Sequence, residues 1–326
     1  MRIVIICLVV SALIYLLMAF TFVFLPIKRV QPEGGLDFDA IAQNDFSVTS
    51  INEQYYKARD NSKLFYRYIR GSSAETIVLL HGSGTEGRYL IPLAKKLNTE
   101  LNITVIIPDL RGHGYSRGST PGDINYLGQL EHDLEDLISH IKSSYANAKV
   151  ILAGHSSGGG LAVKYGGNNL NQFDGAILLA PYLGYQAPTV RKNSGGWVQV
   201  AKLRYAGLAM LNNIGITFLN HYQVLFFNRP TKVAGELQLE SYSYQLNESF
   251  SPQSYATDLS NYKSPMLLLV GELDEAFYPN EFKKVLEINA PHADFHLVKN
   301  TKHLNLPLSE EAAKLMQLWI IKSYDN

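Results

Sequence analysis

The chain has 326 residues, of which 46% are hydrophobic, so it is long enough to bury a substantial core. Lysine plus arginine and aspartate plus glutamate number 29 each, and this balance gives no reason to expect a nucleic acid or an anionic polymer as a partner. The single cysteine, Cys7, excludes an intrachain disulfide framework and a cysteine metal cluster.

Apolar residues without any charge fill the segment Ile3 to Leu25 near the beginning of the chain. At about 1.5 Å per helical residue the segment is roughly 34 Å long, enough to cross the hydrocarbon core of a bilayer. A cleaved signal peptide is the alternative, but its apolar region is usually only about 7 to 15 residues long, and no small-x-small cleavage site follows before Pro26. We therefore expect residues 1–28 to form an uncleaved, single-pass membrane anchor. Basic residues flank the segment on both sides, so the positive-inside rule gives no orientation.

The alternation of apolar and amphipathic segments defines the rest of the organisation. Residues 29–50 carry proline, paired glycines and scattered acids, which predicts a linker, and a folded domain is expected over 51–326. Short apolar runs predict strands at Leu64 to Ile69, Thr76 to Leu80, Ile103 to Ile107, Lys149 to Ala153, Ala176 to Leu179, Met266 to Val270 and Phe295 to Val298. Helices are expected near Tyr89 to Asn98, Leu127 to Ser144, Gly158 to Tyr165, Pro279 to Ile288 and Ser309 to Lys322. This pattern is typical of an α/β fold, with a mostly parallel central sheet and helices on both faces.

The alternation fails over residues 186–254, approximately, and this segment is predicted to be an inserted lid. Within it, Tyr205 to Asn228 contains no charged residue. Asparagine, glutamine, histidine and glycine interrupt this run too often for a second membrane span. An apolar lid over the substrate is one interpretation, and a small core of the inserted segment itself is the other. Both can hold at once.

The sequence Gly154-His155-Ser156-Ser157-Gly158 lies between a predicted strand and a predicted helix. A serine hydroxyl becomes a useful nucleophile when a sharp strand-to-helix turn presents it to a base without crowding from its neighbours. Glycines two residues before and after the serine permit such a turn. The motif alone is weak, but its position between a strand and a helix favours Ser156 as a nucleophile.

Residues that follow different strands of a parallel sheet converge at one edge, which selects partners for the serine. His303 lies five residues past the strand that ends at Val298, where a general base can reach Ser156. His292 precedes that strand and His296 falls within it, so neither is expected at this edge. The histidines at 132 and 140 are predicted on a helix surface.

A carboxylate is needed to hold the tautomer of the base and to stabilise its imidazolium form. Asp274 follows the predicted strand that ends at Val270 and is our candidate. Glu272 and Glu275 lie beside it and are rival acids. The alternative for all three is that they are solvated loop charges.

Donors for an oxyanion are expected in His81-Gly82-Ser83-Gly84, which closes the strand Thr76 to Leu80. The backbone N–H of Ser83, together with that of Ser157 directly after the nucleophile, would supply two donors. A phosphate-binding loop is the rival interpretation. It is disfavoured because no Lys-Ser or Lys-Thr pair and no glycine triplet of the dinucleotide type follows.

Five motifs occur in a fixed order: His81 to Gly84 with Gly87-Arg88-Tyr89, Asp109 to Ser116, the Ser156 elbow, Gly271 to Asp274, and the late His303. Together they resemble the α/β-hydrolase superfamily, most closely its monoacylglycerol lipase, lysophospholipase and serine aminopeptidase-like branch. The resemblance covers about residues 55–326 apart from the insertion. It implies that Ser156 is the nucleophile, His303 the base, Asp274 its orienting partner, and Ser83 and Ser157 the oxyanion donors. It also implies a structural role for His113.

Three functions are consistent with these residues. The first is hydrolysis of carboxylic esters of a monoacylglycerol or lysophospholipid type through an acyl-serine, with no metal or organic cofactor. The second is cleavage of peptides or amides, with Glu236, Glu240 or Glu248 near the end of the insertion recognising a free amine. The third is a membrane-tethered binding protein that has the fold without the activity. Dehalogenase chemistry is disfavoured because it needs a carboxylate in place of Ser156.

Overall fold

The central sheet has eight strands, in the order β1-β2-β4-β3-β5-β6-β10-β11. The computed structural model describes residues 1–30, 34–39, 41, 51–116, 118, 120–145, 148–168, 172–229 and 237–324. The strands are β1 (Asn52–Lys57), β2 (Lys63–Ile69), β3 (Glu75–Leu80), β4 (Thr104–Pro108), β5 (Lys149–His155), β6 (Gly175–Leu179), β10 (Met266–Gly271) and β11 (Asp294–Val298). The β1–β2 and β2–β4 pairs are antiparallel, and all other pairs are parallel. The predicted α/β fold with a mostly parallel sheet is therefore confirmed.

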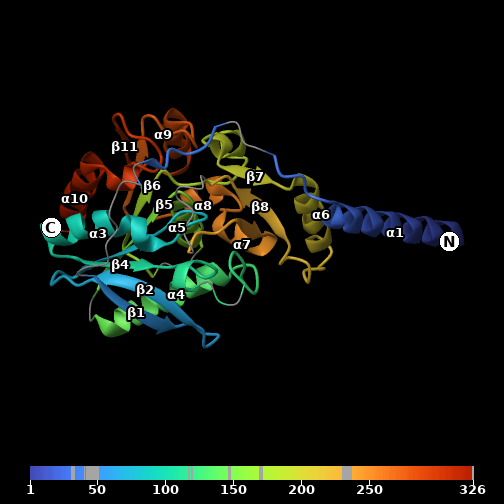
Figure 1. Cartoon of the computed structure of the whole chain (residues 1–326), viewed down its shortest axis with the longest axis horizontal. Coiled ribbons are helices and arrows are strands. Elements are labelled where there is room, and N and C mark those ends of the chain that lie inside the picture. Colours follow the sequence, from blue (N-terminus) through green and yellow to red (C-terminus); the bar gives the residue numbers. More distant parts are fainter. Residues whose placement is uncertain are drawn as a thin grey trace.

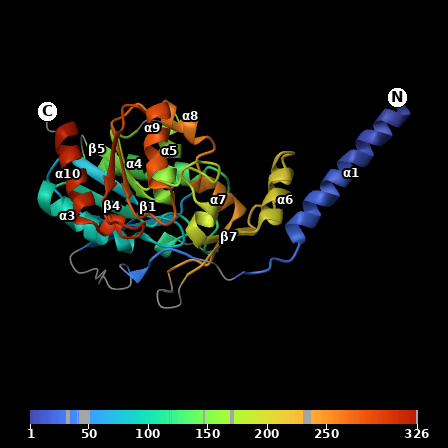
Figure 2. The same cartoon turned by 90° about the horizontal axis from the view of Figure 1, so that it is seen from above.

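Helices cover the sheet on both sides, which explains why β3, β4, β6 and β10 are buried at every residue. The helices of the core are α3 (Ile91–Leu101), α4 (Gln129–Ser144), α5 (Ser157–Gly167), α8 (Tyr255–Asn261), α9 (Pro279–Asn289) and α10 (Glu310–Tyr324). Helices α3 and α10 contact each other, while α4, α5, α8 and α9 form a second continuous group. The sheet lies between these two groups (Figures 1 and 2).

The insertion between β6 and α8 has its own small antiparallel sheet, in the order β7-β8-β9. Its elements are β7 (Val198–Val200), α6 (Lys202–Asn212), β8 (Gln223–Phe227), β9 (Ser241–Ser243) and α7 (Tyr244–Phe250). The uncharged run that the sequence assigns to a lid is divided between α6, a turn and β8. In Figure 1, α6 and β8 lie between the central sheet and the helix α1.

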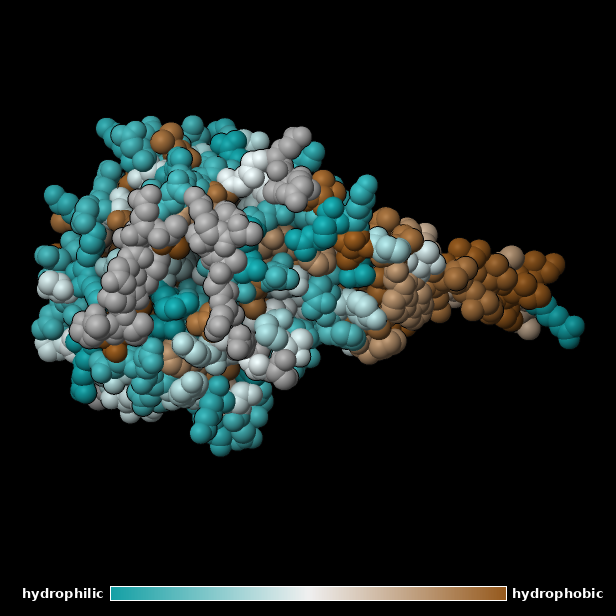
Figure 3. Space-filling view, viewed as in Figure 1, coloured by the Kyte–Doolittle hydropathy of each residue, from teal (hydrophilic) through white to brown (hydrophobic). Residues whose placement is uncertain are grey.

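Helix α1 (Arg2–Phe24) is the one helix among the described residues that is long and apolar enough to cross a membrane, and only 6% of its apolar window is buried. Its last turns pack against α6. Gly207 permits this contact, since a Cβ there would lie 2.6 Å from the carbonyl oxygen of Ala19. The Tyr15 hydroxyl donates to the Met210 carbonyl at 2.8 Å. Figure 3 shows the apolar surface of α1 continuing onto the adjoining part of the domain.

The segment after α1 also contacts the domain, although the sequence predicts a linker there. Gln199 accepts from the backbone N–H of Val30 at 3.1 Å and donates to the carbonyl of Lys28 at 2.7 Å. Residues 34–39 and 41, which we call the strap, lie against the domain, where Phe38 is part of the main hydrophobic core and Leu36 and Ile41 pack against that core. Packing of these three apolar side chains is the physical reason why this part of the predicted linker lies against the domain. Residues 42–50 of the predicted linker lie outside the described part.

Candidate active site

Ser156 occupies a sharp turn between β5 and α5. Its backbone angles are φ 54° and ψ −119°, a conformation that costs free energy for a residue with a side chain. The flanking glycines are required sterically. A Cβ on Gly154 would lie 2.4 Å from the carbonyl carbon and oxygen of Gly158, and one on Gly158 would lie 2.5 Å from the carbonyl oxygen of His81. The turn leaves Ser156 half-buried, while the residues on both sides of it are buried.

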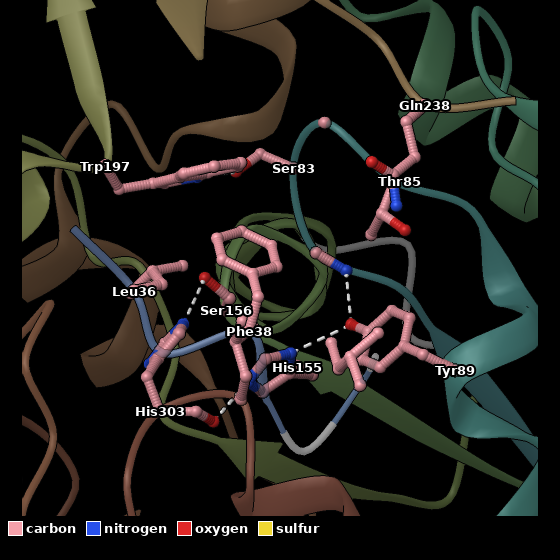
Figure 4. Close-up of a pocket in the computed structure, with 14 residues that line it drawn as sticks. Leu36, Phe38, Ser83, Thr85, Tyr89, His155, Ser156, Trp197, Gln238 and His303 are labelled. Carbon is pink, nitrogen blue, oxygen red and sulfur yellow. Dashed lines mark hydrogen bonds between the residues drawn. The ribbon is translucent and has the colours of Figure 1, made fainter. Parts of the chain in front are cut away.

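The structure brings Ser156, His303 and Asp274 into one hydrogen-bonded chain. Nε2 of His303 lies 3.0 Å from the Oγ of Ser156. Figure 4 marks this hydrogen bond with a dashed line. Nδ1 of the same ring lies 2.8 Å from Oδ2 of Asp274. The other carboxylate oxygen of Asp274 accepts from the backbone N–H groups of Ala276 and Phe277 at 2.9 and 2.8 Å. Asp274 is thereby fixed, and it can orient the imidazole in turn.

The charge environment of His303 favours its protonated form. Burial lowers the pKa of His303, but the Asp274 carboxylate raises it through its charge and its hydrogen bond, and Glu275 adds to this. The net pKa lies above the ordinary value for histidine. An imidazole with a raised pKa is a stronger base for removing a proton from a hydroxyl.

The two rival carboxylates have different contacts. Glu275 accepts from the backbone N–H of His303 at 2.9 Å through one oxygen, and from that of Asp37 at 2.8 Å through the other. Glu272 accepts from the backbone N–H of Asn300 at 3.2 Å. Of the three acids, only Asp274 is hydrogen bonded to the imidazole.

The loop after β3 lies against the elbow, and its amides are arranged around Ser83. The N–H of Gly82 donates to the Tyr89 hydroxyl at 2.8 Å, and that of Gly84 donates to the Tyr242 hydroxyl at 2.7 Å. Tyrosines therefore hold both amides that flank Ser83. Ser157 is the first residue of α5, so its N–H has no acceptor within the helix. Ser83 and Ser157 line the same cavity as Ser156, and their N–H groups stay the predicted oxyanion donors.

Two features of the site were missed in the sequence. His155 lies in the variable position of the elbow motif, and its ring centroid is 4.7 Å from that of His303. Its Nδ1 is 2.8 Å from the Tyr89 hydroxyl and its Nε2 is 3.2 Å from the His303 carbonyl. Burial, with a further contribution from His303, holds the pKa of His155 well below its ordinary value, so the ring is neutral. Its place directly before Ser156 in the motif was the available signal.

The second missed feature is Trp197, which stacks on Phe227 with ring centroids 5.1 Å apart. Its Nε1 is 3.5 Å from the Ser83 hydroxyl oxygen. A tryptophan within an irregular insertion gives no sequence signal of this position.

His113, for which the resemblance implies a structural role, is not part of the hydrogen-bonded chain of Ser156, His303 and Asp274. His113 is fully buried, and its Nε2 is 2.5 Å from the Tyr242 hydroxyl. Its Nδ1 is 3.0 Å from the Arg111 carbonyl. Burial lowers the pKa of His113 well below its ordinary value, and nearby His81 lowers it further. These contacts suit a neutral ring that fixes the loop.

Two cavities, of about 40 and 50 Å³, meet at Ser156. Both are bounded by Ser83, Ser156, Trp197 and His303. The first is further lined by the strap and by Gly82, Gly84, Thr85, Tyr89, His155, Gln238 and Leu304. The second is further lined by Ser157, Tyr182, Ser194, Val198, Leu225, Tyr242, Asn247, Phe250, Ser251, Ala276 and Phe277. No aspartate, glutamate, lysine or arginine is among the described residues that line either cavity.

Of the three acids proposed to recognise an amine, the two that the structure describes lie away from both cavities. Glu240 forms an ion pair with Arg229 at 3.4 Å and its side chain is 83% exposed. Glu248 accepts from the Tyr205 hydroxyl at 2.6 Å. Neither lines a cavity, and Glu236 lies outside the described residues. Across the described ranges, no group of three or more histidine, cysteine or acidic side chains is arranged to hold a metal ion.

The sequence assigns the apolar residues between Tyr205 and Asn228 to a lid, but these residues lie in three different environments. Leu225 lines the second cavity, and Phe227 stacks on Trp197. Leu208 and Leu211 are buried in a separate cluster with Ala19 and Val23 of α1. The exposed members include Ile214 and Phe218. Only the β8 part of the run therefore faces Ser156.

A parallel sheet with a strained serine turn after its central strand, and with an acid and a histidine after later strands, defines the α/β-hydrolase fold. Residues 71–307 match the family model of the serine aminopeptidases S33, also called Hydrolase_4. The match covers well over half of the chain, so the protein belongs to this family of hydrolases.

Curated relatives share part of this domain. The chain is 36% identical to a proline iminopeptidase of Saccharolobus solfataricus over 119 residues, 36% of this chain and 37% of the relative. It is 33% identical to a probable protein phosphatase methylesterase 1 of Caenorhabditis elegans over 108 residues, 32% of this chain and 29% of the relative. It is 31% identical to the monoglyceride lipase of Rattus norvegicus over 130 residues, 38% and 41% of the two chains. The matched region thus spans less than half the length of each of these relatives.

Solved structures show the same fold at low sequence identity. A soluble variant of the monoglyceride lipase from Saccharomyces cerevisiae superimposes with a TM-score of 0.65 at 16% identity, over 86% of this chain and 98% of that one. The monoacylglycerol lipase of Paleococcus ferrophilus gives a TM-score of 0.59 at 18% identity, over 80% and 100% of the two chains.

Proposed function

We propose that this protein is a serine hydrolase that cleaves carboxylic esters with a lipid-like acyl chain, through an acyl-serine intermediate. The observation that carries the proposal is the continuous hydrogen-bonded chain from Asp274 through His303 to Ser156. Ser156 lies at the meeting point of two uncharged cavities, which suits an ester with two neutral halves.

In the proposed mechanism, Nε2 of His303 removes the proton of the Ser156 hydroxyl while Oγ attacks the ester carbonyl carbon. The tetrahedral oxyanion accepts hydrogen bonds from the N–H groups of Ser83 and Ser157. The intermediate collapses as the imidazolium gives its proton to the departing alcohol, which leaves an acyl-Ser156. Water, activated by the same histidine, then releases the carboxylic acid. Asp274 stabilises the imidazolium during both halves of the reaction.

The ester preference rests on the lining of the site and on the relatives. A free amine on a substrate needs a carboxylate partner, and neither cavity has one among its described lining residues. Monoglyceride lipases are among the relatives in both sequence and structure. Burial of an apolar chain stabilises binding by about 0.8 kcal/mol per methylene.

We further propose that α1 anchors the enzyme in a membrane. The exposed apolar surface of the helix supports this, and so does its contact with α6. Cleavage as a signal peptide would uncover the face of α6 that includes Gly207, Leu208 and Leu211. An uncleaved helix keeps that face covered, and it would hold the site close to a bilayer that contains its substrate.

The test uses the full chain in detergent micelles, with a fluorophosphonate probe and p-nitrophenyl esters from acetate to palmitate. We expect the wild type to be labelled and to turn over esters. Ser156→Ala should lose labelling and at least about a thousandfold in kcat. Ser139→Ala, a change at an exposed serine of α4, is the matched control and should behave as wild type. Persistent labelling of Ser156→Ala would refute the assignment of the nucleophile.

Amide cleavage is the alternative function, and the similarity to a proline iminopeptidase is the reason to test it. Comparison of aminoacyl amides with acyl esters of the same size decides it. A higher kcat/KM for the amides would replace the ester proposal. Failure of the wild type to react with any serine-directed probe would instead favour an inactive binding protein.

A further inference from the structure

We propose that the strap, which joins α1 to the hydrolase domain, is a specificity element of the active site. Phe38 is its main residue: with Leu36 and Ile41 it lines the first cavity beside Ser156 and limits the size of the ester group that binds there. This inference rests on the proposed hydrolase function, because it concerns the substrate of the same site.

Phe38 is built into the site although it precedes the folded domain in the sequence. Its side chain is 8% exposed, and its ring centroid lies 5.2 Å from that of Trp197. Trp197 in turn contacts Phe227 and the hydroxyl of Ser83. Phe38 is therefore the first member of an aromatic row that ends at the candidate oxyanion loop. Figure 4 shows its ring among the residues around Ser156.

Polar contacts hold the strap to the two loops that carry the proposed acid and base. The backbone N–H of Asp37 donates to Glu275, which directly follows Asp274. The Asp37 carboxylate pairs with the ammonium group of Lys302, directly before His303, at 2.7 Å. Glu275 also accepts from the backbone N–H of His303. The strap is thus attached to the catalytic loops themselves rather than to a remote surface.

Because the first cavity is small, the side chains of the strap that line it affect the size of the group that can bind. The cavity has a volume of about 40 Å³. The other residues that line the cavity belong to the elbow, the β3 loop, the His303 loop and the insertion. The side chains of the strap can be shortened without changing any group that takes part in the proposed reaction.

The experiment compares the full-length wild type with Phe38→Ala in detergent micelles. One ester series lengthens the acyl group from acetate to palmitate, and a second enlarges the alcohol at constant acyl length. In one of the two series we expect the ratio of kcat/KM for large over small substrates to rise about tenfold, the effect of one or two methylenes of added space. The matched control, Phe218→Ala, removes an exposed phenylalanine that lines neither cavity and should leave both ratios unchanged.

Unchanged ratios in both series, with fluorophosphonate labelling of Ser156 intact, would overturn the strap proposal and leave the hydrolase proposal standing. Absence of labelling in the wild type would overturn the hydrolase function instead. If Phe38→Ala does not fold, as judged by its melting temperature, Phe38→Leu and Phe38→Trp decide the matter. They should shift the size preference in opposite directions, and equal profiles for both would contradict the proposal.

Discussion

The central sheet and the parts that surround it are built on different principles. Strands such as β10 are buried at every residue, and their ends fix Ser156, Asp274 and His303 within hydrogen-bond distance. The insertion and α1 instead contact each other through a separate small apolar cluster, and single hydrogen bonds tie the segment after α1 to the rest of the protein. From this comparison we expect the core to set the chemistry of the site and the periphery to set which groups reach it.

The largest expected effect comes from a change in the core, at Asp274. Asp274→Asn keeps the size of the side chain but removes the charge that stabilises the His303 imidazolium and fixes its tautomer. We expect kcat for a short ester to fall by about 10⁴-fold with little change in melting temperature. Steady-state kinetics and thermal denaturation measure the two quantities.

The control for this change is Asp294→Asn, at a surface carboxylate that pairs with Lys322 at 3.2 Å. It should keep wild-type activity, since surface ion pairs contribute little. A fall of less than tenfold in Asp274→Asn would show that another acid orients the base.

The periphery is tested by Gly207→Leu, which places a side chain where α6 meets the backbone of α1. Overpacking of this kind costs about 1 to 3 kcal/mol. We expect the amides of α6 to exchange with solvent about tenfold faster or more, while kcat/KM for a short soluble ester changes by less than about twofold. Hydrogen exchange measured by mass spectrometry in detergent micelles gives the first quantity.

Leu203→Ala is the matched control on the same helix, at a half-exposed side chain. Its α6 amides should exchange as in the wild type. A large loss of activity in Gly207→Leu would contradict the division between core and periphery, because it would mean that α1 docking shapes the reacting groups.

The sequence predicted the core far better than the periphery, and the reason is physical. Buried parallel strands leave continuous apolar runs, and the carboxyl ends of such strands must share an edge, so Asp274 and His303 followed from spacing. Strand β1 was missed because Asn52–Lys57 is a polar edge strand with one buried residue. In the strap, isolated apolar residues among glycines and acids give no periodic signal.

The uncharged run of the insertion shows most clearly what the sequence could not predict. Lack of charge predicted that Tyr205 to Asn228 would form an apolar lid or a small core of the insertion, and Leu208 and Leu211 are buried. Apolar composition does not specify the partner, however, and here the partner of these two residues is α1 rather than the site. The contact of α1 with α6 joins segments nearly two hundred residues apart, and only the folded arrangement reveals it.

The smallest expected effect is a shift in pH dependence that connects the two regions through Glu275. His303 acts as a base only when neutral, so kcat/KM falls as the pH falls through its pKa. Burial lowers this pKa, whereas Asp274 and, to a smaller extent, Glu275 raise it above the ordinary value. Glu275→Gln removes one of the raising charges and keeps an oxygen that can accept from the His303 backbone. The acidic limb of the profile should therefore move to lower pH, as kcat/KM measured against pH will show.

Glu272→Gln is the matched control, because its carboxylate lies on the neighbouring turn and accepts from Asn300. Its acidic limb should stay at the wild-type pH. A limb that moves to higher pH in Glu275→Gln would mean that release of the strap, whose Asp37 amide also binds Glu275, outweighs the lost charge. The pH profile therefore distinguishes a purely electrostatic role of Glu275 from one in which the periphery acts on the base.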